Sequence, residues 1–255
     1  MARRVAYVWR TFRTGLGFGV FGAGAFIAAL CILPFARWLP GDRERRAQRI
    51  VHLTCRLWVR FAIALGLFRV QWNGVDGLRS RDPFVVVANH PTLIDIVLLI
   101  ACMPQADCVV KRAAWRNPLL RWVVSGAGYI RNDGGGALIE TCVDRLRRGH
   151  RLVLFPEGTR SPARRLGPFH RGAAHVALRS GVPLLPVVIT CDPPTLLKGQ
   201  RWYDVPDRTV QFTVQVDRPL RPIEISDAIT EGIAARRLTA EMREFYERRL
   251  VHVQA

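Results

Sequence analysis

The sequence predicts an α/β fold in which a mixed sheet is flanked by helices and preceded by an N-terminal membrane-anchoring helical segment. Three observations support this prediction. From about residue 72 onward, short apolar runs alternate with helical stretches, an order that places helices on the faces of a sheet. Residues 209–216 (TVQFTVQV) alternate between apolar and polar side chains with period two, as in a half-exposed strand. Residues 15–35 carry no charge and just reach the roughly 20 residues that a helix needs to cross a bilayer.

The uncharged run 15–35 is the candidate membrane anchor. It is rich in glycine and contains Pro34 near its end, so it is a weaker helix former than a leucine-rich span. A buried core helix and a cleaved signal peptide are the alternatives, and the signal peptide fits poorly because a basic cluster follows directly. The excess of arginine after the run favours a cytoplasmic position for the domain that follows. We therefore expect a protein of a bacterial-type cytoplasmic membrane with that domain on the cytoplasmic side.

A second apolar stretch, residues 57–70, is interrupted by Arg60 and Arg69. It is too short to span a bilayer easily, and its charges suit the bilayer surface, so we expect it to be interfacial. Near residue 70 this membrane-like sequence gives way to globular sequence. The chain is thus expected to divide into a membrane-associated helical segment, residues 1–70, and an α/β domain, residues 71–255.

The elements of the α/β domain follow from hydrophobic periodicity, helix caps and turn residues. Gly149 and Gly181 each close a helical stretch, and Ser226 is the expected cap of the last helix. The expected strands are 84–88, 108–110, 129–131, 152–155, 184–190 and 209–216. The expected helices are 93–102, 115–124, 137–148, 172–179 and a closing helix that runs to about residue 251.

Composition and charge limit the class of protein. A hydrophobic content of 49% over 255 residues is enough for a sizeable core and excludes disorder as the main state. The six cysteines form no Cys-x-x-Cys pair, which favours buried free thiols over a disulfide scaffold. The net charge is +18, and 36 of the 38 basic residues are arginine. Half of that excess lies in residues 1–60, where arginines bracket apolar segments, so an anionic membrane or anionic ligands fit better than nucleic acid.

The first motif is NHPTLID, residues 89–95, directly after the predicted strand 84–88. The junction between a strand and the next helix is where α/β sheets place ligands. His90 and Asp95 can form a dyad in which the carboxylate holds one ring nitrogen as N–H and leaves the other free to take a proton. The alternative is structural, because Thr92 and Asp95 fit a capping box and Asn-His-Pro is an ordinary turn.

The second motif is FPEGTRS, residues 155–161, at the end of the predicted strand 152–155. A proline and a glycine shape this loop. Its backbone N–H groups, together with Arg160, can hold an oxyanion or a phosphate. An ordinary polar turn is the alternative interpretation of this segment.

Together with the apolar run VPLLPVVI around Pro186, the two motifs resemble the lysophospholipid acyltransferase family, which includes the 1-acylglycerol-3-phosphate acyltransferases. The resemblance covers roughly residues 70–215, and both motifs are intact and in the family's order. It implies that His90 is the general base that deprotonates an acceptor hydroxyl, and that Asp95 orients it. The hydroxyl then attacks an acyl thioester, either acyl-CoA or an acylated carrier protein, without a further cofactor or a metal. Membrane phospholipids and the acyl donor are the implied partners, in phospholipid biosynthesis.

The same resemblance implies a set of residues that bind substrate phosphate. The residues that match the motif tied to the acceptor's glycerol phosphate are Glu157, Gly158, Thr159 and Arg160. Lys111 stands where family members commonly carry a lysine after the second strand, and it is the second implied phosphate ligand. One block departs from the family pattern, because Arg131 follows Gly128 in a shifted arrangement. Arg131 is expected to do the same work from that place, or else the acceptor differs.

Other interpretations remain open at this point. The departure at Arg131 leaves room for another lysolipid or an aminolipid as acceptor, and a transacylase would use the same dyad. A non-catalytic membrane lipid-binding protein is a further alternative. A serine hydrolase fits poorly because no Gly-x-Ser-x-Gly occurs, and a zinc enzyme because His170 and His175 stand five residues apart. The polar segment 191–203 is either a lid or, as we expect, a surface loop.

Overall fold

The computed structural model describes residues 2–32, 38, 40–162, 165–222 and 229–254. The expected helix cap Ser226 and the proline at position 34 lie outside these residues. Within them, helices pack on both faces of a mixed sheet, and an apolar helix opens the chain. The predicted fold class is therefore confirmed.

A seven-stranded sheet runs through the described part of the chain in the order β1-β7-β6-β2-β5-β3-β4. Its strands are β1 Phe68–Asn73, β2 Val85–Ala88, β3 Asp107–Lys111, β4 Ile130–Asn132, β5 Leu152–Leu154, β6 Leu184–Asp192 and β7 Val210–Val216. Every neighbouring pair is parallel except β6 and β7, which are antiparallel. The parallel strands β2 to β5 bring their carboxyl ends to one edge, where ligands bind in folds of this kind.

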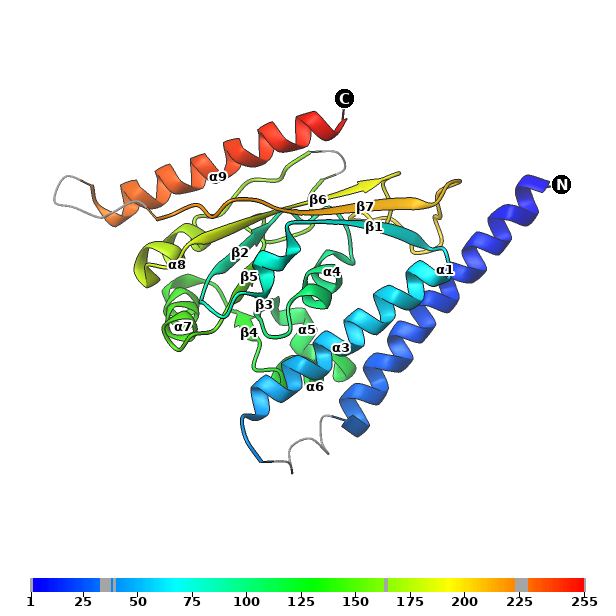
Figure 1. Cartoon of the computed structure of the whole chain (residues 1–255), viewed down its shortest axis with the longest axis horizontal. Helices are drawn as coiled ribbons and strands as arrows, with labels where there is room; N and C mark the ends of the chain where they lie inside the picture. The colour runs from blue at the N-terminus through cyan, green and yellow to red at the C-terminus, as the bar shows by residue number, and fades with distance from the viewer. Residues whose placement is uncertain (1, 33–37, 39, 163–164, 223–228, 255) are drawn as a thin grey trace.

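The helices form a layer on each face of the sheet. They are α1 Ala2–Ile27, η1 Ala28–Ile32, α3 Arg43–Ala64, η2 Val75–Arg79, α4 Asp95–Cys102, α5 Arg112–Arg116, α6 Pro118–Gly126, α7 Gly135–Arg147, α8 Gly172–Ser180 and α9 Glu231–Gln254. Figure 1 shows α7, α8 and α9 on one face, and α3 and α4 on the other, with α1 running alongside α3.

Strand β2 is the centre of the fold because both of its faces are buried. Val85 and Val87 belong to the hydrophobic cluster under α7, α8 and α9. Val86 and Ala88 belong to the larger cluster under α3 and α4. Successive side chains of a strand point to opposite faces, so an unbroken apolar run is what a strand between two helix layers requires.

The stretch 57–70 corrects one sequence expectation. It contains the end of α3 and the start of β1, and Trp58, Val59 and Phe68 are buried in the core. The interfacial interpretation is therefore wrong for these side chains, although Leu57 on the opposite face of α3 is 64% exposed. Strand β1 pairs along its whole length with β7, so the expected domain boundary near residue 70 falls inside a strand of the sheet.

The expected single helix over residues 115–124 is two helices, α5 and α6. The break lies at Asn117, whose backbone is extended, and Pro118 is the first residue of α6. Proline disfavours a helical backbone at the residue before it, and it is well tolerated at the first position of a helix. The sequence pattern of apolar residues alone did not reveal this division.

The free cysteines fit the expectation of buried thiols. Cys55, Cys108 and Cys142 are buried and unpaired, and Cys102 and Cys191 are partly buried and unpaired. Burial raises the pKa of Cys102 to about 11, so its thiol is protonated at neutral pH.

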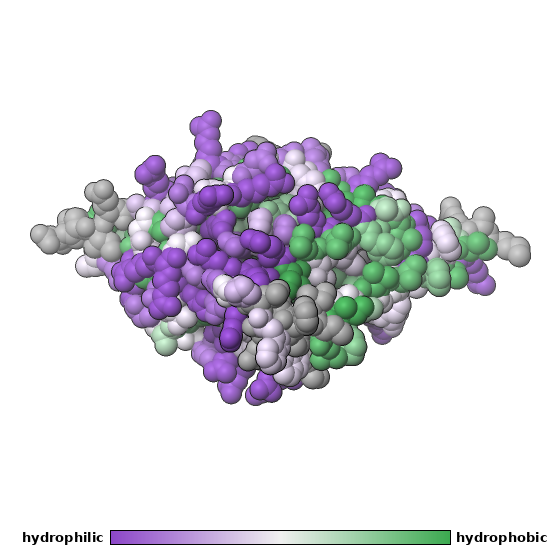
Figure 2. Space-filling view, turned by 60° about the horizontal axis from the view of Figure 1, so that its bottom comes forward, coloured by the Kyte–Doolittle hydropathy of each residue, from purple (hydrophilic) through white to green (hydrophobic). Residues whose placement is uncertain are grey.

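The N-terminal helix is the part of the fold that is exposed and apolar. Residues Arg4–Leu30 are long and apolar enough to cross a membrane, and 17% of the most apolar window is buried against the rest of the chain. Figure 2 shows hydrophobic residues gathered along one side of the molecule, beside a largely hydrophilic surface. The exposed large hydrophobic residues of this helix are Val5, Tyr7, Val8, Trp9, Phe12, Leu16, Val20, Phe26, Ile27 and Leu30.

Although exposed, α1 is docked on the α/β domain. The indole Nε1 of Trp58 in α3 donates a hydrogen bond of 2.8 Å to the carbonyl oxygen of Gly17. A Cβ atom at Gly17 would overlap the side chain of Leu67, so the glycine permits the close approach. Tyr7 donates a hydrogen bond of 3.0 Å to the carbonyl oxygen of Tyr203, in the loop between β6 and β7. Helix α1 therefore has a defined position next to that loop.

Candidate active site

The His90–Asp95 pair is formed. Nδ1 of His90 lies 2.8 Å from Oδ2 of Asp95, whose side chain is completely buried, while the His90 side chain is 19% exposed. The backbone N–H of Thr92 donates to the same carboxylate over 2.7 Å, and the Thr92 hydroxyl donates to its other oxygen. An ionised carboxylate only accepts hydrogen bonds, so Nδ1 carries the proton and Nε2 is the free acceptor. This is the arrangement of a general base with its orienting carboxylate.

The environment of Asp95 combines opposing effects on its pKa. Complete burial is the largest and raises the pKa above the ordinary value of 3.8, because it disfavours the charged form. The hydrogen bonds from His90 and Thr92 oppose this effect. The capping-box interpretation is only half realised, because the Thr92 hydroxyl bonds to the carboxylate and helix α4 begins at Asp95 without a side-chain cap.

The end of β2 is clamped to β6 by the side chain of Asn89. Its Nδ2 donates to the carbonyl oxygen of Ile189, and its Oδ1 accepts from the Ile189 N–H, each over 2.8 Å. These bonds continue the strand pairing one residue past β2 and leave His90 as the first residue outside the ladder. The His90 ring then stacks on Phe155, with ring centres 4.1 Å apart and planes inclined by 21°. Two neighbouring strand ends thereby hold the imidazole in place.

Glu157 joins three segments of chain rather than facing solvent. Its carboxylate is buried and accepts from the His90 N–H at 3.1 Å, the Ser161 hydroxyl at 2.6 Å and the Gly167 N–H at 2.7 Å. The Ser161 N–H also donates to the carbonyl oxygen of His90 over 2.7 Å. The loop after β5 is thus hydrogen-bonded directly to the backbone of His90.

The rest of the FPEGTRS loop forms a tight turn that ends at Arg160. Gly158 has a φ of 62°, and its N–H donates to the carbonyl oxygen of Phe155. Nη1 of Arg160 donates to the carbonyl oxygens of Leu196 and Leu197 over 3.1 and 3.0 Å. Among the described residues, no further hydrogen bond involves its Nε or Nη2. Arg160 therefore ties this loop to the loop after β6 with one nitrogen and leaves two for a ligand.

Lys111 and Arg131 lie at the same edge of the sheet as His90 but farther along it. Both are exposed, and they stand on the neighbouring strands β3 and β4, where Lys111 pairs with Asn132. Strand β5 separates β3 from β2, so Lys111 is two strand spacings, about 10 Å, from the line of β2. Arg131 is one strand farther and bonds to Asp133 over 2.6 Å. The structure thus places both cations on one side of the dyad without bringing them into contact with it.

Sequence reasoning missed several residues that build this site. Asn89 and Thr92 lie inside the first motif, and their polar side chains within two residues of His90 were the sequence signal that could have indicated them. Tyr246 of α9 reaches the carbonyl oxygen of Val87 from the other end of the chain, and no sequence signal marks it. Among the described residues, no group of three or more His, Cys, Asp or Glu side chains is arranged to hold a metal ion.

The Acyltransferase family model matches residues 69–190, which include both motifs. A chloroplastic 1-acyl-sn-glycerol-3-phosphate acyltransferase of Brassica napus is 31% identical over 154 residues, 58% of this chain and 44% of its own length. A similar acyltransferase of Chlamydomonas reinhardtii is 28% identical over 221 residues, 84% of this chain and 64% of its own. The chain therefore spans about half to two thirds of the length of these relatives.

A bacterial relative and a solved structure extend the comparison. The lyso-ornithine lipid O-acyltransferase of Pseudomonas aeruginosa is 35% identical over 158 residues, 60% of this chain and 58% of its own length. The crystal structure of a 1-acyl-sn-glycerophosphate (LPA) acyltransferase from Thermotoga maritima superposes with a TM-score of 0.75 at 23% identity. That match covers 99% of this chain and 98% of the other, so the fold is shared along the whole length, α1 included.

Proposed function

We propose that this chain, whose residues 69–190 match the Acyltransferase family model, transfers a fatty acyl group from an acyl thioester to the hydroxyl of a lysophospholipid. The observation that carries the proposal is the bond of 2.8 Å between His90 Nδ1 and the buried Asp95 carboxylate, at the carboxyl end of a central strand. It leaves His90 Nε2 as a base within a partly exposed site. Acyl transfer from a thioester to a hydroxyl requires such a base.

The reaction proceeds by direct transfer. His90 Nε2 accepts the proton of the acceptor hydroxyl while that oxygen bonds to the thioester carbonyl carbon. Asp95 stabilises the imidazolium that forms, because its carboxylate faces the Nδ1 proton. The tetrahedral intermediate then releases the thiolate, which takes the proton from Nε2. The products are an ester and a free thiol, and His90 returns to its starting state without a covalent acyl-enzyme.

The cationic groups around the dyad suit the phosphates of the substrates. The Nε and Nη2 atoms of Arg160 are available to a phosphate oxygen. Arg160 lies in the loop that turns at Gly158. Thr159 follows in the same turn, while the buried Glu157 supports that loop from behind. Phosphate recognition by arginine and backbone N–H groups is common because these hydrogen bonds are charge-assisted.

Lys111 and Arg131 supply further positive charge at the edge formed by β3 and β4. We assign them to substrate phosphate as well, at the far end of the site from Arg160. Both the lysophospholipid and an acyl-CoA carry phosphate, so two groups of cations on one sheet edge are consistent with two anionic substrates. Acylated carrier protein is the alternative to acyl-CoA as the acyl donor.

The proposed acceptor is 1-acylglycerol-3-phosphate, and the reaction belongs to phospholipid biosynthesis. Two of the relatives described above carry that acceptor in their names. The relative from Pseudomonas aeruginosa is named for lyso-ornithine lipid, and it is the specific observation that favours a second candidate, another lysolipid acceptor. The exposed apolar helix α1 supports attachment to the membrane that holds these lipids, with the α/β domain on the cytoplasmic side.

Purified protein in nanodiscs tests the proposal. Wild-type protein is given a labelled acyl donor, either acyl-CoA or acylated carrier protein. The acceptor is lysophosphatidic acid or lyso-ornithine lipid, and the formation of the ester and the release of the thiol are both measured. We expect one ester and one thiol per turnover, lost in His90→Ala with folding intact. Turnover that survives His90→Ala, or no turnover with any pair of substrates, would contradict the proposal.

A further inference from the structure

A pocket of about 680 Å³, open mouth included, lies between α1, the start of β1 and β7, and the loop after β6. It reaches Ile94, the residue before Asp95, and Leu196, whose carbonyl oxygen accepts the bond from Arg160. The N–H of Leu93 donates to the same carbonyl oxygen over 3.1 Å. The wall of this pocket is therefore hydrogen-bonded to both motifs of the proposed active site.

The pocket is apolar on one side and positively charged on the other. Aromatic side chains from α1, α3, β1 and β7 form the apolar wall, namely Phe18, Trp58, Phe68 and Phe212. Three arginines and no acidic residue occur among the described residues that line it. Such a surface fits an amphiphile with a negative group and an aliphatic chain.

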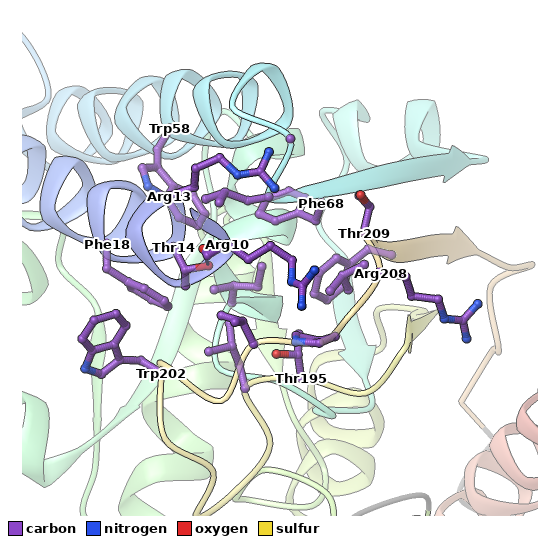
Figure 3. Close-up of a pocket in the computed structure, with 18 residues that line it drawn as sticks. Arg10, Arg13, Thr14, Phe18, Trp58, Phe68, Thr195, Trp202, Arg208 and Thr209 are labelled. Carbon is purple, nitrogen blue, oxygen red and sulfur yellow. Dashed lines mark hydrogen bonds between the residues drawn. The ribbon is translucent and has the colours of Figure 1, made fainter. Parts of the chain in front are cut away.

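The three arginines differ in what they bond to. Arg208 pairs with both oxygens of Asp192, at 2.9 and 3.0 Å, and points away from the centre of the pocket (Figure 3). Nη1 of Arg13 donates to the carbonyl oxygen of Leu65 over 3.1 Å. Arg10 extends its guanidinium into the pocket, as Figure 3 shows, and makes no side-chain hydrogen bond or ion pair with a described residue.

Arg10 is therefore a cation placed for a ligand that the protein does not itself supply. Its Nε is buried without a partner, and an unsatisfied buried donor on a charged group is costly. An anion that accepts from Nε and one terminal nitrogen would remove that cost through a bidentate charge-assisted pair. Phosphate has the geometry for this pair. The hydroxyl of Thr14, one helical turn along α1 in the same wall, already donates to the backbone carbonyl oxygen of Arg10 over 2.9 Å, so the guanidinium is the donor left for the anion.

We propose that this pocket is the acceptor subsite, in which Arg10 binds the phosphate of a lysophospholipid whose single chain lies on the aromatic wall. The inference rests on the proposed function and adds a phosphate ligand from the N-terminal helix. Lys111 and Arg131 lie across the dyad, on β3 and β4, whereas the pocket lies on the side of β7 and β1. The two sides of His90 then serve different substrates.

The chemical structures of the two substrates indicate which of them occupies the pocket. In a lysophospholipid, the phosphate and the chain both attach to the glycerol that carries the reacting hydroxyl, so one pocket can hold both. In an acyl thioester, the chain and the phosphates lie on opposite sides of the reacting carbonyl. Helix α1, which contributes Arg10 and Phe18 to this pocket, also carries the exposed apolar residues described above.

Equilibrium binding without an acyl donor provides the first test. Short-chain, water-soluble lysophosphatidic acid and the matching monoacylglycerol are titrated into wild-type protein, Arg10→Gln, Arg10→Lys and Arg208→Gln. We expect Arg10→Gln to weaken lysophosphatidic acid binding about 10- to 100-fold, the range of a charge-assisted hydrogen bond, and to leave monoacylglycerol unchanged. Arg10→Lys should recover part of the affinity, and Arg208→Gln should change it less than about threefold because Asp192 already neutralises Arg208.

Equal loss for both lipids, or no loss in Arg10→Gln, would overturn the phosphate assignment. Steady-state kinetics gives the second test, with KM for lysophosphatidic acid rising in Arg10→Gln while KM for acyl-CoA stays constant. A rise in KM for acyl-CoA alone would assign the pocket to the donor and overturn the proposal. Because binding needs no turnover, Arg10-dependent binding without any acyl transfer would support this site and contradict the proposed function.

Discussion

The hydroxyl of Tyr246 donates a hydrogen bond of 2.6 Å to the carbonyl oxygen of Val87, three residues before His90. The hydroxyl oxygen of Tyr246 in turn accepts a hydrogen bond of 3.2 Å from the Val187 N–H. Val87 is opposite Pro186 in the parallel pairing of β2 with β6, so the hydroxyl stands between a carbonyl of β2 and the N–H of the next residue of β6. A tyrosine of α9 thus bridges the two central strands where the ladder is interrupted, and it is completely buried there.

Replacing Tyr246 with phenylalanine should lower the free energy of unfolding by about 1–3 kcal/mol, since it leaves the Val87 carbonyl and the Val187 N–H buried without a partner. Chemical denaturation measures the change. Tyr203→Phe is the matched control, because the Tyr203 hydroxyl bonds to Arg201 on the surface and its loss should cost at most about 0.5 kcal/mol. Equal effects of the two substitutions would contradict the bridging role.

Gly167 offers a test of the Glu157 contacts. A Cβ at this position would lie 2.7 Å from Oε2 of Glu157, the oxygen that accepts from the Gly167 N–H. Gly167→Ala should therefore displace the carboxylate, disturb its bond to the His90 N–H and lower kcat more than it changes KM.

Gly136→Ala is the control for this substitution, because nothing lies within 4 Å of its added Cβ and the residue is helical. That change should leave kcat constant and stabilise the protein by about 0.5–1 kcal/mol. Steady-state kinetics and thermal unfolding of both variants make the comparison. Loss of activity in Gly136→Ala, or full activity in Gly167→Ala, would be inconsistent with a carboxylate that holds the catalytic loop.

The central strands and the dyad were predictable because local sequence marks them. The apolar run of β2 ends at polar residues, and this change locates both the strand end and His90. In contrast, β1 was missed because it is short and carries Arg69 and Gln71, and its pairing with β7 joins segments about 140 residues apart. Strand formation at such a site depends on a partner that no local pattern reveals.

The misjudged part of α3 has a related explanation. Its exposed face carries Leu57 and its buried face Trp58, so both faces are partly apolar and the pattern suits a bilayer surface as well as a core. Only the position of the sheet decides between them. The partners of Arg160 and Tyr246 were likewise out of reach, since each bond crosses more than 35 residues and ends on a backbone carbonyl.

Arg160 is expected to combine two roles that a substitution can separate. Arg160→Lys keeps a positive charge but loses the planar fork, so it cannot bond to the carbonyl oxygens of Leu196 and Leu197 and to a phosphate together. KM for lysophosphatidic acid should rise about tenfold or more, and KM for the phosphate-free monoacylglycerol should rise less. The exposed Arg171, changed to lysine, controls for surface charge. An equal rise for both acceptors would show that only the loop contact matters.

Asp95→Asn should separate the catalytic role of Asp95 from its effect on stability. The amide group facing Nδ1 would donate a hydrogen bond, so the proton of the imidazole moves to Nε2 and the base is lost. We expect kcat to fall about 10³-fold or more, as for other His–Asp pairs in which the tautomer is inverted.

The stability of the same variant should respond to pH in a defined direction. Burial raises the pKa of Asp95 in the folded protein above its ordinary value of 3.8. The favourable contribution of this group is therefore fully present below that value and is lost as pH rises through the raised pKa. Asparagine does not titrate, so the unfolding free energy of wild type minus that of Asp95→Asn should decrease as the pH rises above the ordinary pKa of the carboxyl group. Denaturation at a series of pH values measures this difference, with the exposed Asp204→Asn as control.

A difference that stays constant or increases with pH would show that the carboxylate is better solvated than its complete burial implies.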